Sequence, residues 1–458
     1  MNAAADRFIT TLRDISGPTG VVDDPELTTR YRWDWTGRFG TDAPVTVARP
    51  GTADEVAAIV EVCAERQVAI VPQGGNTSLV GGSVPVAGEL VLSTERLSGI
   101  GSVDATTGSL TAGAGTPLAV VQQAAARAGW RYGVDIASRD SATIGGTVAT
   151  NAGGLHVLRY GTTRAQVTGV AFVDGTAARH GMSRATLRDN TGYDLPSLLC
   201  GSEGTLGVIT AVRVRLVPEF TFRTAALLRF ANPRDAAVAV EALRGVLPSV
   251  ESAEFFFAPG LELVCATFSY PPPFVETVGG YVLVEVADTD DRTAALGAAV
   301  ESLSGVSDVA VADDPAGLAR LWRYRERHTE AIATVGVPHK LDVAVPPGSL
   351  AEFVARVTNV VGAVDPDARV WLFGHGGEAS VHVNVTGPAD DDDAVDDAVL
   401  ALVVDMGGSI SAEHGIGTAK RAWIDRIQDE PERRLRARLR DAFDPHRILN
   451  PGVLTGSR

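Results

Sequence analysis

The chain has 458 residues, of which 45% are hydrophobic and 21% are charged, and its formal net charge is −16. This length exceeds the usual size of one domain, so we expect two domains around separate cores. The acidic balance argues against a nucleic-acid-binding protein, because phosphate recognition needs a basic stripe.

The cysteines, Cys63, Cys200 and Cys265, lie far apart in apolar surroundings. This spacing favours neither a disulfide framework nor a thiolate metal site, and it is typical of buried, reduced thiols. Residues 1–17 have helical periodicity and mixed charge, and the sequence has no apolar run of 18 residues. We therefore expect a cytoplasmic protein without a transmembrane segment.

The first part of the chain, up to Val217, mixes short strands with helices. Apolar residues at helical spacing predict a helix over 52–66, with Thr52 as its N-cap and Glu55 completing a capping box. Strands are predicted at 45–50 and 68–74, and another helix at 117–128. This alternation indicates an α/β region.

Glycine-rich segments at 72–82, 135–154 and 201–210 interrupt this region. Small side chains leave backbone N–H groups open to close approach, which suits anionic oxygens and a large flat ligand. A plain flexible loop is the alternative for the first segment taken alone, since it lacks the lysine of a P-loop and the glycine spacing of a Rossmann fingerprint.

Beyond residue 220 the pattern changes to interleaved helices and strands, with strands predicted at 224–230 and 281–287. This texture predicts an α+β domain with an antiparallel sheet. The acidic residues Asp390 to Asp393, Asp396 and Asp397 predict the start of a solvated helix rather than a calcium site. A charged helix is predicted over 430–440.

Residues 370–385 predict a β-hairpin around a glycine turn. Period-2 alternation places His382 and Asn384 on one face of the second strand, and His375 ends the first strand within reach of that face. Two imidazoles and a carboxylate would leave coordination positions open, as in a catalytic zinc site. The alternative is that these histidines are core residues whose ring nitrogens are hydrogen-bonded within the protein.

In the loop 411–417, Glu413 and His414 are adjacent, with small residues on either side. Adjacent side chains in non-helical backbone point apart, so the carboxylate could face a metal while the imidazole faces a substrate. A helix entry with a capping glutamate is the alternative. Upstream, a helix predicted over 321–333 places Arg325 and Thr329 on one face, and Lys340 begins a strand; solvated surface residues are the alternative there.

Together the three glycine-rich segments resemble the flavin-binding domain of the vanillyl-alcohol oxidase superfamily, the PCMH-type FAD-binding fold. The resemblance implies FAD with its pyrophosphate wrapped by the first loop and its isoalloxazine and ribityl chain along the later segments. Because the first loop has neither His nor Cys, we expect non-covalent FAD. The implied FAD contacts are Pro72, Gln73, Gly74, Gly75, Asn76, Thr77, Ser78, Ser141, Gly145, Asn151, Gly154, Ile209 and Asn450.

His375 and His382, followed by Glu413-His414-Gly415-Ile416-Gly417, resemble the metal-dependent D-2-hydroxyacid dehydrogenase branch of this superfamily. The resemblance implies that His375, His382 and Glu413 bind a divalent metal, with zinc expected, and that His414 is the base. It further implies that Arg325, Thr329, Lys340 and Asn384 bind substrate, which favours D-2-hydroxyglutarate.

One stretch departs from the branch. The usual Gly-Asp-Gly-Asn turn after the first histidine reads Gly377-Glu378-Ala379-Ser380 here.

The overall expectation is an α+β protein with an FAD-binding domain of two α/β subdomains (1–219), a substrate- and metal-binding cap domain with an antiparallel sheet (220–425), and a C-terminal segment (426–458) that packs back on the FAD domain. A D-lactate or glycolate dehydrogenase, a metal-independent flavin oxidase and a non-catalytic flavin-binding protein are the alternatives. Family analogy favours electron-transfer flavoprotein or a quinone as electron acceptor, and a homodimer is left open.

Overall fold

The computed structural model describes residues 3–182, 185–389 and 391–454. The chain divides into two compact units. The first comprises Met1–Gly153, Thr162–Glu219 and His414–Arg458, and the second comprises Gly154–Gly161 and Phe220–Glu413. One change of unit falls after Glu219; residues 414–425 belong to the first unit and 154–161 to the second.

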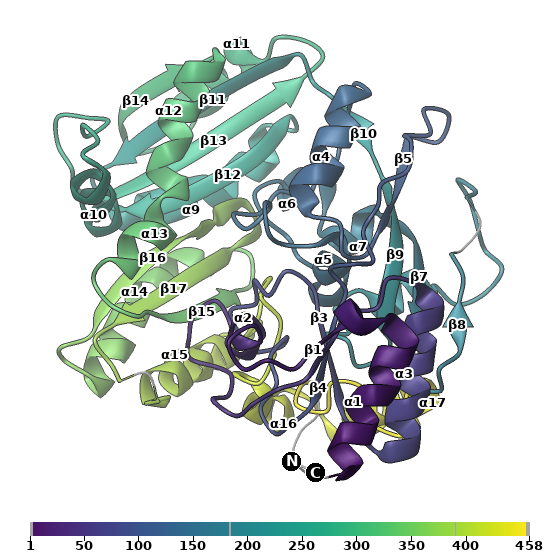
Figure 1. Ribbon diagram of the computed structural model, residues 1–458. Coiled ribbons are helices and arrows are strands. Elements are labelled where there is room, and N and C mark those ends of the chain that lie inside the picture. Colours follow the sequence, from purple (N-terminus) through teal and green to yellow (C-terminus); the bar gives the residue numbers. More distant parts are fainter. Residues whose placement is uncertain (1–2, 183–184, 390, 455–458) are drawn as a thin grey trace. The chain divides into compact units, whose positions relative to one another are not determined.

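Two four-stranded sheets organise the first unit (Figure 1). One has the order β1-β2-β4-β3, in which β2, β4 and β3 are parallel, and the other is antiparallel with the order β5-β9-β7-β8. The strands are β1 (Val21–Val22), β2 (Val47–Ala48), β3 (Ile70–Gln73), β4 (Leu90–Ser93), β5 (Ser109–Gly113), β7 (Val167–Val173), β8 (Arg179–His180) and β9 (Val208–Arg215), with β6 (Trp130–Arg131) paired to β10 (Val217–Pro218).

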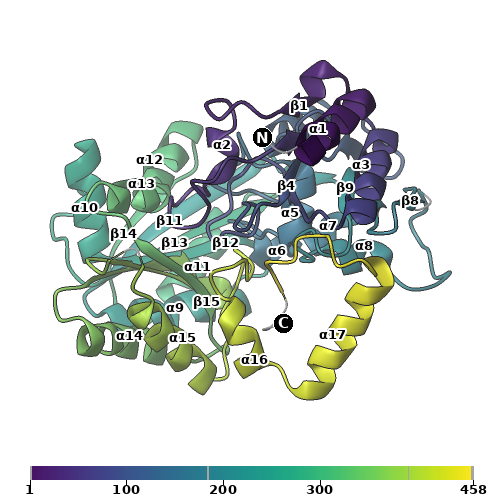
Figure 2. The ribbon, with the colours of Figure 1, turned by 60° about the horizontal axis from the view of Figure 1, so that its bottom comes forward.

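The helices of the first unit begin with α1 (Ala3–Ser16) and α3 (Ala53–Arg66), which lie side by side in Figures 1 and 2. The predicted capping of α3 is confirmed, since Thr52 accepts the N–H of Glu55. The glutamate carboxylate returns to the N–H of Gly51 rather than to that of Thr52. The other helices are α2 (Thr29–Arg32), α4 (Leu118–Arg127), α5 (Ile144–Thr150), α7 (Thr163–Gln166), α8 (Leu195–Leu199), α16 (Ile424–Ile427) and α17 (Glu430–Phe443).

The C-terminal helix α17, yellow in Figure 2, is part of the first unit and runs three residues beyond its predicted end. Leu439 and Phe443 on this helix pack against the core around β7 and β9. The ring of Phe443 stacks on Phe172 of β7 at a centroid distance of 6.1 Å. Apolar burial at the end of the helix therefore holds the C-terminal segment on this core.

A seven-stranded antiparallel sheet forms the centre of the second unit, in the order β14-β11-β13-β12-β16-β17-β15. The antiparallel sheet expected beyond residue 220 is thus confirmed. Its strands are β11 (Phe222–Phe230), β12 (Val250–Phe257), β13 (Gly280–Asp288), β14 (Val306–Ala312), β15 (His339–Ala344), β16 (Arg369–His375) and β17 (Ser380–Thr386).

Helices cover both faces of this sheet (Figure 2). One face carries α9 (Pro233–Val246), α14 (Leu350–Val364) and α15 (Ala394–Asp405), and the other carries α10 (Ala258–Phe268), α12 (Pro315–Glu326) and α13 (His328–Ala333). The short helices α6 (Val157–Tyr160) and α11 (Thr293–Glu301) complete the unit. Helix α15 has Asp396 and Asp397 in its first turn, as predicted, while Asp390 lies outside the described residues.

The prediction of one continuous helix over 321–333 is wrong. Helix α12 ends at Glu326 and α13 begins at His328. The Nδ1 atom of His328 lies 3.1 Å from the carbonyl oxygen of Arg325. A side chain that competes for a main-chain carbonyl breaks the helical ladder at that point, so Arg325 and Thr329 belong to different helices.

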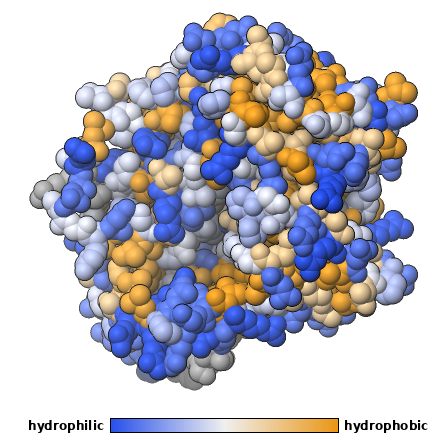
Figure 3. Space-filling model, turned by 180° about the vertical axis from the view of Figure 1, so that it is seen from behind, coloured by the Kyte–Doolittle hydropathy of each residue, from blue (hydrophilic) through white to orange (hydrophobic). Residues whose placement is uncertain are grey.

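The cysteines and the surface agree with the composition. Cys63 and Cys200 are buried free thiols and Cys265 is partly buried; burial raises the pKa of Cys63 to about 12. On the face drawn in Figure 3, hydrophilic and hydrophobic residues are interspersed, as is usual for a protein surface. Among the described residues, no helix is both long and apolar enough to cross a membrane.

Candidate active site

A row of polar side chains crosses four neighbouring strands of the second unit. Strand register places Glu254 opposite His375, and places His382 opposite Asp342. The predicted hairpin and its alternation are confirmed, because Val381, Val383 and Val385 are buried on the opposite face. His375 and His382 face each other with their Nε2 atoms 3.2 Å apart.

Glu413, the last residue of the second unit in the chain, lies beside this row. Its Oε1 lies 2.8 Å from Nε2 of His375, and its backbone N–H donates to Oδ2 of Asp342 at 2.6 Å. Candidate ligand atoms of His375, His382 and Glu413 all lie within 4.8 Å of one another. The structure therefore brings together the three residues that the sequence predicted as metal ligands.

The chemistry of these donors fits a divalent metal. Two ring nitrogens and one carboxylate oxygen converge, which is the ligand set of catalytic zinc and leaves a position for substrate. Burial by itself would lower the pKa of His375, but the carboxylates of Glu254 and Glu413 raise it well above 6.5. A cation between these groups would satisfy both carboxylates without a proton on the ring.

Glu254, which the sequence analysis missed, supports the first histidine. Its Oε1 lies 2.8 Å from Nδ1 of His375, and its Oε2 lies 2.7 Å from the Arg325 guanidinium. The side chain is 1% exposed. A carboxylate on Nδ1 fixes the tautomer that leaves Nε2 free to bind a metal. No local pattern marks Glu254, because it stands in a continuously buried strand 121 residues from its partner.

We expect Glu254→Gln to lower metal affinity by about 10- to 100-fold, because the amide no longer enforces the His375 tautomer. Competition with a chromogenic chelator measures this. Glu285→Gln is the matched control, since Glu285 is another buried glutamate of the same sheet that pairs with an arginine, Arg223. Equal metal affinity in the two variants would contradict the support role.

The turn that departs from the family keeps a tight geometry in the structure. It forms a short 3-10 segment, Gly376–Glu378, which ends at Ala379 with φ 54° and ψ 33°, in the left-handed region. The usual glycine would adopt this conformation without strain, whereas alanine cannot. Burial, with help from Glu254 and Glu413, raises the pKa of Glu378 to about 8 against the opposing effect of His375.

Ala379→Gly is expected to stabilise the protein by about 0.5–1 kcal/mol, because it relieves the left-handed strain of alanine. Chemical denaturation, followed by tryptophan fluorescence, measures the change in the free energy of unfolding. Ala298→Gly, in the exposed middle of α11, is the control with the opposite sign and should cost about 1 kcal/mol. Destabilisation by both substitutions would show that Ala379 is not strained in its left-handed conformation.

Two of the predicted substrate residues, Lys340 and Asn384, lie on the same face of the sheet as the histidines, and the other two lie on helices. Lys340 stands opposite Asn384 in the strand register, and Asn384 is buried. Arg325 lies over the ring of Phe373 at 4.7 Å, and Thr329 is partly buried on α13. Arg325 is thus near this face but already paired with Glu254.

A pocket lies within the first unit. Main chain and small side chains of all three glycine-rich segments line it, together with His414. Six predicted FAD contacts are in its wall: Pro72, Gln73, Gly74, Ser78, Gly145 and Ile209.

Close main-chain packing builds this wall, and glycines make it possible. A Cβ atom on Gly207 would lie 2.9 Å from the carbonyl oxygen of Val173, and one on Gly145 would lie 2.6 Å from the Cβ of Ala114. The wall therefore offers backbone to a ligand, which fits the long, flat and doubly phosphorylated FAD molecule.

The other predicted FAD contacts do not line the pocket. Asn76 donates to the carbonyls of Arg30 and Trp33, and Asn151 caps α5 and accepts the N–H of Arg164. Asn450 donates to the carbonyls of Gly82 and Glu203, which are pocket residues. Gly75 and Thr77 lie next to lining residues in the chain, Ser141 packs its carbonyl oxygen against Gly75, and Gly154 belongs to the second unit.

Sequence reasoning missed several residues of the wall. Ser83 and Thr94 lie outside the quoted segments, although Thr94 directly follows β4, next to β3 in the parallel sheet. The carboxyl ends of adjacent parallel strands meet at one edge and commonly bind ligands there. The others are Val80, Gly82, Gly146, Ala149, Thr150, Glu203, Gly204 and Gly207.

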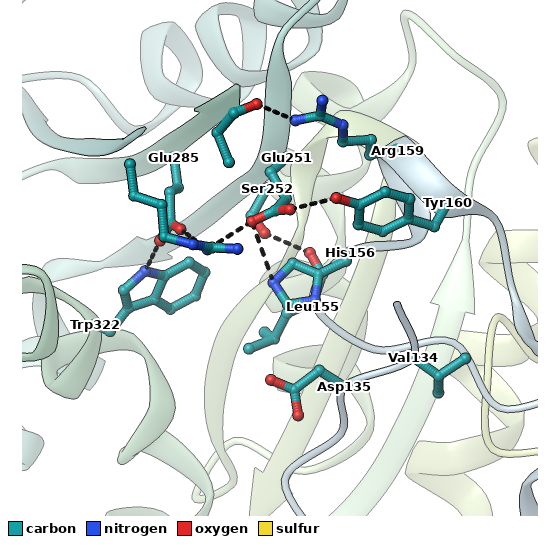
Figure 4. A network of polar contacts seen from close by, with 12 residues as sticks. Val134, Asp135, Leu155, His156, Arg159, Tyr160, Glu251, Ser252, Glu285 and Trp322 are labelled. Atoms are coloured by element: carbon teal, nitrogen blue, oxygen red, sulfur yellow. Dashed lines mark hydrogen bonds and ion pairs between the residues drawn. The ribbon is translucent and has the colours of Figure 1, made fainter. Parts of the chain in front are cut away.

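A second polar network fastens the segment 154–161 within the second unit (Figure 4). The buried carboxylate of Glu251 accepts hydrogen bonds from Tyr160 at 2.6 Å and from Arg223 at 2.7 Å. Ser252 donates to the carbonyl of Leu155, also at 2.6 Å. The stretch that follows the second glycine-rich segment is thus held on β12.

The glycine-lined pocket and the histidine–carboxylate cluster define a flavin-dependent oxidoreductase with a separate α+β unit. Two family models match the chain: an FAD binding domain over residues 44–180, and the C-terminal domain of FAD linked oxidases over 221–454. The chain belongs to this FAD-linked oxidase family, as an FAD-dependent D-2-hydroxyacid dehydrogenase.

Curated relatives match along nearly the whole chain. D-2-hydroxyglutarate dehydrogenase of Xanthomonas citri pv. viticola is 38% identical, covering 94% of this chain and 93% of its own. The mitochondrial D-2-hydroxyglutarate dehydrogenase of Bos taurus is 36% identical, covering 95% and 81%.

Solved structures show the same fold at low sequence identity. p-Cresol methylhydroxylase has a TM-score of 0.79 at 14% identity, covering 99% of this chain and 97% of its own. Alkyldihydroxyacetonephosphate synthase has a TM-score of 0.74 at 17% identity, covering 98% and 86%. The predicted PCMH-type fold is confirmed.

Proposed function

We propose that this dehydrogenase oxidises D-2-hydroxyglutarate to the 2-oxoacid, with non-covalent FAD and a divalent metal, zinc being the first choice. The observation that carries the proposal is the clustering of two kinds of residue at one face of one sheet. The two histidines of the histidine–carboxylate cluster and Lys340 lie on strands of that sheet, and Arg325 lies on α12 over Phe373 of the sheet. The relatives that match nearly the whole chain carry the same substrate in their names.

The protein's own residues supply binding and proton transfer. When bound, FAD supplies the acceptor for the hydride from C2, and a metal lowers the pKa of the substrate hydroxyl. His375, His382 and Glu413 would hold that metal. Arg325 offers a planar fork and Lys340 a point charge for carboxylates, with Thr329 and Asn384 as neutral partners.

His414 takes the hydroxyl proton as C2 becomes a carbonyl carbon, so one proton and one hydride leave the alcohol. It is the next residue after Glu413 in the chain, and it lines the glycine-walled pocket of the first unit. One peptide bond therefore separates the proposed base from a proposed ligand, which suits groups that act on the same substrate carbon.

Anaerobic bleaching of the flavin tests the proposal. D- and L-2-hydroxyacids with one or two carboxylates are added to the holoenzyme with and without chelator, and flavin absorbance is followed. The proposal expects fast bleaching by D-2-hydroxyglutarate, slow bleaching by its L-enantiomer, and loss of bleaching with chelator. Insensitivity to chelator would favour a metal-independent flavin enzyme, and no bleaching by any acid would indicate a flavin-binding protein without this activity.

A D-lactate or glycolate dehydrogenase is the second candidate. The pairing of Arg325 with Glu254 favours it, because that guanidinium already has a carboxylate partner. Arg325→Ala separates the two candidates: a much larger loss of kcat/KM for a dicarboxylate than for a monocarboxylate supports D-2-hydroxyglutarate. Equal losses would support the smaller substrates.

The pH dependence reports on Lys340. Burial lowers the pKa of Lys340 from 10.5 to about 8. We expect the ratio of kcat/KM for a dicarboxylate to that for a monocarboxylate to fall as pH rises through about 8, because the ammonium loses its proton. Lys340→Arg, which stays charged, should abolish this fall, and a fall that persists would contradict the role of Lys340.

The same shift has a consequence for stability. The unfolded chain binds more protons at this site than the folded one between pH 8 and 10.5. The contribution of Lys340 to the free energy of unfolding therefore increases as pH rises across that range.

Three further proposals concern the cofactor and partners. The lack of His and Cys in residues 72–82 supports non-covalent FAD, so acid precipitation should release the yellow colour. Electron-transfer flavoprotein or a quinone is proposed as the acceptor by family analogy, and a homodimer as the assembly. Reoxidation assays with each acceptor and light scattering test these proposals.

A further inference from the structure

Glu203 lies in the wall of the first unit's pocket and is 8% exposed. Its two carboxylate oxygens have different partners: Oε1 accepts the N–H of Ile416 at 2.7 Å, and Oε2 accepts the N–H of Gly417 at 2.8 Å. Hydrogen bonds to an ionised acceptor are stronger than neutral ones. The carboxylate thus accepts hydrogen bonds from two consecutive peptide N–H groups of the loop that begins at His414.

The loop conformation is shaped around this carboxylate. Gly415 has φ 85°, and a Cβ atom there would lie 2.8 Å from Oε1 of Glu203. Gly417 has φ 54°, and its Cβ would lie 2.0 Å from the carbonyl oxygen of Val80, which also accepts the N–H of Thr418. Both glycines have positive φ, and each packs closely against a neighbouring group, Gly415 against Glu203 and Gly417 against Val80. The loop therefore has little conformational freedom.

Glu203 is itself firmly held. Its backbone N–H donates to the carbonyl of Ala149 at 2.8 Å, and its own carbonyl accepts from the side chain of Asn450 at 2.7 Å. Ala149 also lines the pocket. The same residue therefore links the wall of the flavin pocket to the loop that follows His414.

We propose that Glu203 is a positioning residue that acts through His414, by fixing the 414–417 loop so that the imidazole meets the substrate hydroxyl. This inference rests on the proposed role of His414 as the base. A proton acceptor must be within hydrogen-bond reach of its proton, and a displacement of about 1 Å can cost on the order of 10²-fold in rate.

Glu203→Gln tests the inference, because its single carbonyl oxygen can satisfy only one of the two N–H groups and its NH₂ group meets the other. We expect the rate constant of anaerobic flavin reduction at saturating FAD to fall by about 10- to 100-fold. Deuterium uptake by peptides covering 414–420, with and without FAD, should become at least about tenfold faster. This second readout does not depend on activity.

Glu89→Gln is the matched control. Glu89 is another buried glutamate of the first unit whose carboxylate accepts two consecutive backbone N–H groups, those of Val86 and Ala87. Both N–H groups meet the same oxygen, Oε2, so the amide oxygen of Gln can still accept them, and we expect this variant to leave uptake at 414–420 and flavin reduction within about twofold of wild type. If Glu203→Gln does not fold, Glu203→Asp retains the charge but is too short to reach both N–H groups, and the same changes are expected.

The double variant with His414→Ala separates positioning from general structure. If Glu203 acts through His414, adding Glu203→Gln to His414→Ala should not slow flavin reduction further. The same fold loss in both backgrounds, or unchanged uptake at 414–420, would overturn the inference. Wild-type enzyme that no D-2-hydroxyacid reduces would instead overturn the proposed function, and the uptake data would still decide whether Glu203 orders the loop.

Discussion

Replacing His414 with alanine is expected to slow flavin reduction by a D-2-hydroxyacid by ~10²- to 10⁴-fold, the usual contribution of a general base. The imidazole lines the glycine-walled pocket, and alanine there leaves the main chain of the wall in place. FAD content should therefore stay close to that of wild type. Stopped-flow reduction under anaerobic conditions, with FAD content from the absorbance ratio, measures both quantities.

His446→Ala is the control, because His446 is an exposed histidine of the same unit. Its flavin reduction should match wild type. Near-normal reduction in His414→Ala would show that another group removes the proton. Loss of FAD in parallel with the rate would assign His414 to cofactor binding instead.

Glu413→Gln is expected to cause the loss of bound metal and to lower activity by at least about 10²-fold. Substitution of a partner outside the ligand shell already costs 10- to 100-fold in metal affinity or activity, so loss of a charged ligand should cost no less. Oε1 of Glu413 lies 2.8 Å from Nε2 of His375, so an amide removes the charge from the centre of the cluster. Metal content after dialysis, measured by plasma mass spectrometry, gives the direct result.

Glu276→Gln controls for the general effect of the substitution, since Glu276 is an exposed glutamate of the same unit paired with Arg229. It should retain both metal and activity. Wild-type enzyme treated with chelator should behave like Glu413→Gln and recover when metal is returned, whereas the variant should not recover at the same concentration. A Glu413→Gln protein with full metal content and full activity would place the metal elsewhere.

The sequence by itself determined the local features of this protein. Alternation along residues 381–385 assigned His382 to the polar face, because side chains on a strand point to opposite sides in turn. Capping of α3 by Thr52 was also predictable from the sequence, because the two interacting residues are only three positions apart in the chain. The glycine-rich segments indicated a backbone surface, and six of the residues predicted from them line one pocket.

Only the tertiary structure decided which distant residues support the site. Glu254 and Asp342 stand in buried strands with no pattern that marks them, yet one holds His375 and the other holds the backbone of Glu413. Arg325 was predicted as a substrate-binding residue on one long helix, and the fold pairs it with Glu254 and ends that helix at Glu326. The carboxylate of Glu203 reaches Ile416 across 213 residues of chain. Sequence periodicity reports neighbours along the chain, whereas these contacts depend on strand order and loop closure, which no local pattern contains.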